Sequence, residues 1–93
     1  MIEVSAELAK VNSAMTLTSA KALFEEGARL IAGPVTAFDL AAVTEVDSSG
    51  LAVVFGWLRE AQRLGKTLRI VNLPQNLSSL AQVYGVSDLL PVS

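Results

Sequence analysis

The sequence predicts an α/β fold in which a mixed sheet of about four to five strands packs against helices. Short apolar runs alternate along the chain with stretches of helical periodicity, and glycine or proline stands at the junctions between them. The predicted order is strand, strand, helix, strand, helix, strand, helix and a short tail. Strands separated by helices favour a sheet that is covered by helices. A chain of 93 residues suffices for one domain, residues 1–93, and is too short for two.

The first third of the chain predicts two weak strands and one helix. Residues 2–8 alternate weakly between apolar and polar side chains, and residues 10–17 offer a second strand. A helical period then begins, and Thr18 or Ser19 is placed to cap its start. Gly33, followed by proline, ends this helix.

The remaining elements follow in alternation. Residues 35–40 are apolar, follow a proline and are too few for a helix, so they predict a buried strand. A second helix is expected over residues 49–64, with Gly65 as its C-terminal signal. Residues 67–71 predict the next strand, and residues 75–84 predict a third helix.

The second helix has two predicted faces. At 100° per residue, one face carries most of the large apolar side chains and should meet the core. That predicted core face consists of Leu51, Val54, Phe55, Leu58 and Ala61. The opposite stripe consists of Ala52, Gly56, Arg59 and Arg63, with Ser48 close to it. Trp57 lies at the edge of the apolar arc, where packing in the core is expected rather than a role as an interface anchor.

Composition excludes several functions. The chain has no histidine and no cysteine, so the commonest general base, thiol chemistry and the commonest transition-metal ligands are missing. No glycine-rich phosphate loop is present, and we expect no catalytic residue, no cofactor and no metal. The net charge of -2 without a basic cluster argues against nucleic acid. Without a signal peptide or an apolar run of spanning length, the chain is expected to be cytoplasmic and not inserted in a membrane.

The most informative motif is Val-Asp-Ser-Ser-Gly-Leu at residues 46–51, where a predicted loop enters the second helix. Helix N-termini present unpaired N–H groups and a positive dipole end. Either Asp47 or Ser48 can therefore cap the helix, and a phosphate on Ser48 would also be favoured by the dipole. For Gly50, relief of crowding in the first helical turn is favoured over close approach of another backbone segment.

The motif at residues 46–51 resembles the signature of STAS domains, the family of sulfate transporters and anti-sigma-factor antagonists. Three further motifs, W-L-R-E-A-Q-R-L-G-K, N-L-P and a C-terminal L-A-x-x-Y-G-V-x-x-L-L-P, resemble the STAS subunits of phospholipid-transport ABC complexes of Gram-negative bacteria. The resemblance implies a STAS fold and a non-catalytic adaptor. Such an adaptor would bind the transporter's ATPase, with its permease, beside the inner membrane and help to maintain outer-membrane lipid asymmetry. The resemblance also places Ser48 at the contact with the ATPase.

Several alternatives remain open at this stage. An anti-sigma-factor antagonist switched by phosphorylation of Ser48 is the second functional hypothesis, and an enzyme of unrecognised type is the third. Ser49, together with the Ala52–Arg63 stripe, serves equally well as a docking surface or as a solvated helix face. Because hydrophobic residues make up 52% of the chain and charged residues only 17%, apolar surface should remain for a partner, and weak homodimerisation is also expected.

Overall fold

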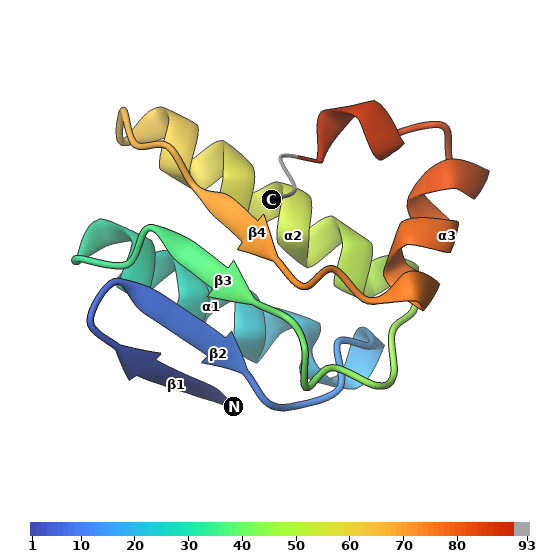
Figure 1. The fold of residues 1–93 in the computed structure, drawn as a ribbon, viewed down its shortest axis with the longest axis horizontal. Helices are drawn as coiled ribbons and strands as arrows, with labels where there is room; N and C mark the ends of the chain where they lie inside the picture. The colour runs from blue at the N-terminus through green and yellow to red at the C-terminus, as the bar shows by residue number, and fades with distance from the viewer. Residues whose placement is uncertain (91–93) are drawn as a thin grey trace.

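Four strands of the described residues form one mixed sheet in the order β1-β2-β3-β4. The computed structural model describes residues 1–90. In it β1 (Ile2–Ser5) pairs antiparallel with β2 (Leu8–Val11). Parallel pairs then join β2 to β3 (Ala37–Asp39) and β3 to β4 (Arg69–Val71) (Figure 1). The predicted α/β fold with a mixed sheet is confirmed.

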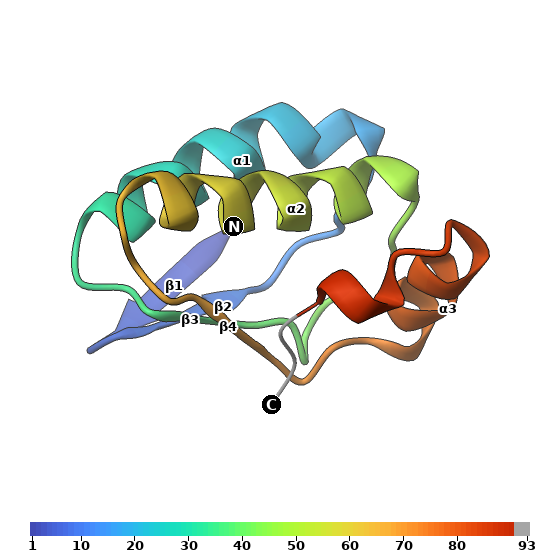
Figure 2. The same ribbon diagram turned by 90° about the horizontal axis from the view of Figure 1, so that it is seen from above.

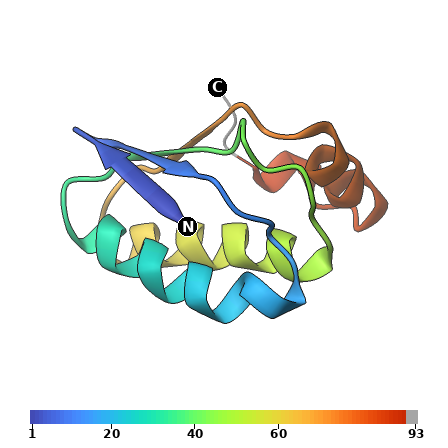
Figure 3. The same cartoon turned by 90° about the horizontal axis from the view of Figure 1, so that it is seen from below.

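Two long helices cover the same face of the sheet. They are α1 (Leu17–Ala32) and α2 (Ser48–Arg63), which lie side by side and run in the same direction (Figures 2 and 3). The helix α3 (Gln75–Val83) packs near the end where α2 begins, and the short 3₁₀ helix η1 (Ser87–Leu89) follows it and lies beside the middle of α2 (Figure 2). The two long helices therefore present both of their N-termini at one edge of the molecule.

Trp57 lies in the centre of the core. Its side chain is fully buried, and its ring stacks on Phe38 of β3 with centroids 4.2 Å apart and planes 7° from parallel. The indole Nε1–H donates to the carbonyl oxygen of Phe24 in α1 at 3.3 Å. Gly27 makes this arrangement possible, because a Cβ there would stand 2.2 Å from Nε1. One side chain thus joins α2 to both α1 and the sheet.

The N-terminal hairpin differs from the predicted strands. The turn falls at Ala6, with φ of 56°, so Leu8 belongs to β2 and not to the first strand. No glycine marks this turn, and the alternating pattern runs through it unbroken. The second strand was predicted at residues 10–17, whereas β2 begins at Leu8 and ends at Val11. Beyond β2, Met15 forms an isolated bridge with Val46.

The start of α1 is also earlier than predicted. Thr16 is the N-cap, and the expected cap by Thr18 or Ser19 is wrong in position. Ser19 still contributes, because its Oγ accepts from the N–H of Thr16 at 3.1 Å and donates to the carbonyl of Ala14 at 2.6 Å. Lys66 caps the C-terminal end of α1, because its Nζ donates to carbonyl oxygens there.

Candidate functional site

Asp47 joins the N-termini of the two long helices. It is the N-cap of α2, and its Oδ1 accepts from the N–H of Ser49 at 2.8 Å and of Gly50 at 3.3 Å. Its other oxygen, Oδ2, accepts from the N–H of Leu17, the first residue of α1, at 3.0 Å. The choice between Asp47 and Ser48 as cap is therefore settled in favour of Asp47, and Ser48 is left free of the capping role.

These hydrogen bonds make the junction sensitive to acid. The bond from Leu17 is the largest influence lowering the pKa of Asp47 below its ordinary 3.8, and the bonds from Ser49 and Gly50 act in the same direction. A carboxyl whose pKa is lower in the folded state stabilises the fold above its unfolded pKa. That stabilisation is lost as the pH falls through the lower, folded value.

We expect Asp47→Asn to reduce this acid sensitivity. The melting temperature of the unmodified chain should fall more steeply than that of the variant from about pH 5 downward. The reason is that the Asp47 carboxylate is protonated as the pH falls, whereas the asparagine amide does not titrate in this range. Melting curves between about pH 2 and pH 7 measure this difference, and Asp88→Asn in η1 is the matched control. Parallel pH profiles of Asp47→Asn and the unmodified chain would contradict the assigned role.

Ser48 is the first residue of α2 and its side chain is exposed. Ser49, next to it, is half-buried and faces α1. Gly50 is buried because the backbone of Met15 passes over it, and a Cβ at Gly50 would lie 2.2 Å from the Met15 carbonyl oxygen. Of the two explanations considered for Gly50, the structure shows the close approach of a second backbone segment. That contact fixes the position of the neighbouring Ser48.

The predicted stripe on α2 is divided between surface and core. Ala52, Arg59 and Arg63 are exposed, but Gly56 is buried, which corrects the expectation that it faces solvent. The ring of Phe24 lies over Gly56, 2.8 Å from where a Cβ would stand. Because a glycine here lets α1 approach closely, α2 is rotated relative to the predicted core face.

The rotation has a consequence on the other side of α2. Phe55 and Leu58 were expected in the core, yet both are only half-buried. Arg63 lies at the far end of α2 from Ser48 and pairs with Glu60 one turn before it; the bond from its Nε measures 3.2 Å. Arg63 is therefore not brought together with the other predicted site residues.

We expect Gly56→Trp to destabilise the fold. A large side chain must displace Phe24 and separate α1 from α2, and overpacking of this kind costs about 1–3 kcal/mol of unfolding free energy, occasionally more. The matched control is Ala52→Trp, one turn earlier and exposed, which should change stability by only about 0.5 kcal/mol. Chemical denaturation of both variants measures the difference, and equal stabilities would contradict the burial of Gly56.

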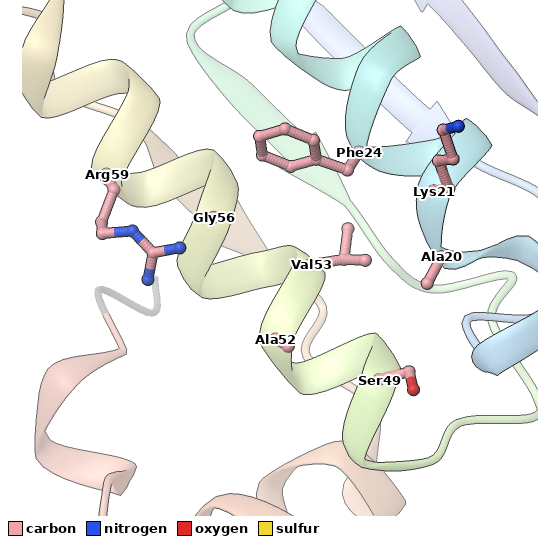
Figure 4. A pocket seen from close by; sticks show the side chains of 8 residues that line it. All are labelled: Ala20, Lys21, Phe24, Ser49, Ala52, Val53, Gly56 and Arg59. Carbon is pink, nitrogen blue, oxygen red and sulfur yellow. The ribbon is translucent and has the colours of Figure 1, made fainter.

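Two grooves flank the exposed Ala52. The first, the α1–α2 groove, has a volume of about 370 Å³ (Figure 4). It is lined by Ala20, Lys21, Phe24, Ser49, Ala52, Val53, Gly56 and Arg59. The second, the α2–η1 groove, has a volume of about 560 Å³. It is lined by Ala52, Phe55, Leu58, Arg59, Gln62, Val86 and Leu89.

A smaller hollow connects the α2–η1 groove to Ser48. It is lined by Ser48, Leu51, Ala52, Phe55, Tyr84 and Val86. Large apolar side chains stand open at this end of the molecule, with Tyr84 57% and Leu89 65% exposed. Ser48, Ser49, Ala52 and Arg59 thus lie on one continuous, largely apolar surface. The sequence analysis had assigned Phe55 to the core. It had not predicted that the C-terminal segment lies beside Ser48.

The comparisons with known proteins identify the family. A family model described as "Mlab, STAS domain" matches residues 4–91, and the chain therefore belongs to the STAS family. A curated relative, the intermembrane phospholipid transport system binding protein MlaB of Haemophilus influenzae, is 39% identical over 54 residues. This match covers 58% of the present chain and 51% of that protein. The matched segment thus spans about half the length of the relative.

Solved structures share the fold at low sequence identity. The anti-sigma factor antagonist SpoIIAA in its unphosphorylated form has a TM-score of 0.72 at 18% identity, over 100% of this chain and 86% of that one. The phosphorylated form of the Bacillus protein gives 0.68, also at 18% identity, over 100% and 89%. A putative anti-sigma factor antagonist from Thermotoga maritima gives 0.72 at 14% identity, over 99% and 83%. These likenesses establish the STAS fold.

The described residues were also compared with the requirements of a membrane-spanning helix and of a metal site. None of the helices within residues 1–90 combines the length and the hydropathy that a membrane-spanning helix needs. In the same part of the chain, no three side chains of the metal-binding types lie together as a candidate metal site.

Proposed function

We propose that this protein is a non-catalytic regulatory subunit of an ABC transporter that maintains outer-membrane lipid asymmetry by moving phospholipids. Its partner is the cytoplasmic ATPase of that transporter, which holds it beside the inner membrane together with the permease. The contact is formed by the Ser48 end of α2 and the adjoining apolar surface of the C-terminal segment. The proposed partner-binding residues are Ser48, Ser49, Ala52 and Arg59, extended by Tyr84 and Leu89.

One observation carries this proposal: an exposed hydroxyl stands beside an open apolar surface at the N-terminal end of α2. Ser48 is exposed, its capping role is taken by Asp47, and the hollow next to it is lined by Phe55, Tyr84 and Val86. Exposed apolar surface of this kind is typical of protein-binding sites. The relationship to a phospholipid transport protein supports the choice of partner.

The proposed mechanism is allosteric. A subunit without catalytic groups changes the activity of an ATPase only if it binds two ATPase states with different affinity. Here the N-terminal end of α2 is held by Asp47 and by the packing of Gly50 on Met15, and it is the part of the surface offered to the ATPase. The ATPase state that fits this surface is stabilised.

A second candidate function is supported by the exposure of Ser48 at a helix N-terminus. In an anti-sigma-factor antagonist this hydroxyl would be phosphorylated by a partner kinase, and the added charge of about -1.5 to -2 would abolish binding. The α2 amides of Ser49 and Gly50 already bond to Asp47, so a phosphate would meet a carboxylate beside it. Phosphorylation would therefore act on the surface and leave the fold unchanged.

Affinity purification separates the two functions. The tagged chain is recovered from its native membranes in mild detergent, and the proteins that copurify are identified by mass spectrometry. Recovery of an ABC ATPase with its permease is the expected result. Recovery of a kinase-like anti-sigma factor, together with a phosphate on Ser48, would establish the second function and overturn the first.

A further inference from the structure

The α1–α2 groove carries two basic side chains, Lys21 and Arg59, whereas the α2–η1 groove carries Arg59 alone. The small side chains of Ala20 on α1 and Ala52 on α2 leave the α1–α2 groove open, and the ring of Phe24 covers Gly56 on its floor. Figure 4 shows Phe24 reaching from α1 toward Gly56 and Val53 pointing back toward α1. The floor is therefore apolar and is held by the packing of two helices.

The charged side chains at the grooves are of one sign. Lys21 and Arg59 are the charged residues lining the α1–α2 groove, the α2–η1 groove and the hollow at Ser48, and both are exposed. They extend from the two helices on opposite sides of the α1–α2 groove (Figure 4). This local basic surface lies on a chain whose net charge is -2. A partner segment that matches this groove would carry an apolar side chain for the floor and carboxylates on either side of it for the two cations.

The groove favours a helical partner segment. Its walls are two α-helices, whose backbone N–H and C=O groups are bonded within each helix, so it offers no strand edge to an extended peptide. An amphipathic helix needs only apolar contacts and side-chain pairing at the rim. Arg59 adds specificity because its guanidinium can bind a carboxylate through two hydrogen bonds.

We propose that the α1–α2 groove binds an acidic amphipathic helix of the ATPase, with an aliphatic side chain on Phe24 and Val53 and carboxylates on Lys21 and Arg59. This inference rests on the proposed function, because it takes the ATPase as the partner. It adds a second half to the interface, on the other side of Ala52 from the hollow at Ser48. The ATPase then contacts α2 on both sides of Ala52.

Charge reversal tests the proposal. Lys21→Glu and Arg59→Glu are compared with Arg29→Glu on α1 and Arg63→Glu on α2, two exposed controls outside the grooves that change the net charge equally. Binding to the purified ATPase is measured by titration calorimetry at low and high salt, and thermal melts verify folding. Each groove variant should weaken binding about 3- to 10-fold and the pair more, while the controls stay within about twofold. The groove variants should also lose most of the salt dependence.

The outcomes separate this inference from the function on which it rests. If the unmodified chain binds the ATPase and the groove variants bind as the controls do, the groove proposal is overturned and the proposed function stands. If the unmodified chain does not bind the ATPase, both fall. If the free chain dimerises and Lys21→Glu with Arg59→Glu abolishes the dimer, the groove serves a second copy and the proposal is wrong.

Discussion

Trp57→Ala is expected to lower the unfolding free energy by about 3–5 kcal/mol, the range for removing a large aromatic side chain from a core. The substitution deletes the stack on Phe38 and the hydrogen bond to the Phe24 carbonyl, and it opens a cavity between α1, α2 and the sheet. Small domains have only about 5–15 kcal/mol in total, so the variant should lose a large share of its stability. Urea denaturation followed by circular dichroism measures the loss.

Trp57→Phe is the matched control for this prediction. It keeps a ring against Phe38 but lacks the indole N–H that bonds to Phe24, so it should lose clearly less stability than the alanine variant. A loss of less than about 1 kcal/mol for Trp57→Ala would show that the side chain is not central to the core.

Ser48→Glu is expected to weaken binding of the ATPase by about 30-fold or more, corresponding to about 2 kcal/mol. The carboxylate would be desolvated within a largely apolar contact and would lie next to Asp47. The fold should be unaffected, because Ser48 is exposed and a negative charge is favourable in the first turn of a helix.

Calorimetric titration of the variant into the purified ATPase measures this effect. Ser5→Glu on β1 adds the same charge at an exposed position on a different element and should bind as the unmodified chain does. An affinity of Ser48→Glu equal to that of Ser5→Glu would remove Ser48 from the interface, whatever the partner.

The sequence predicted the elements well wherever a local signal marks their ends. The second helix, the third helix and the buried strand at residues 35–40 were found because glycine, proline or a change of period borders each of them. The N-terminal hairpin was misplaced because its turn uses Ala6 in a left-handed conformation, which alanine rarely adopts. No composition signal exists for such a turn.

The site was predicted in part, and its errors come from contacts distant in sequence. Ser48 follows from the motif at residues 46–51, and the exposed Ala52 and Arg59 follow from helical spacing. The burial of Gly56 depends on Phe24, which is 32 positions earlier, and the third hydrogen bond of Asp47 comes from Leu17. Helical periodicity describes one helix alone, so it cannot show which face a neighbouring helix will cover.

The central claim is that the Ser48 end of this protein contacts an ABC transporter ATPase. Site-specific photocrosslinking tests it most directly, with a benzophenone amino acid in place of Tyr84, an exposed aromatic residue that lines the hollow with Ser48. The same probe at Val4 on β1 is the control, since Val4 is exposed on a different element. We expect a covalent adduct with the ATPase from position 84 and none from position 4. Equal crosslinking from both positions, or an adduct at position 84 with a different protein, would contradict the account.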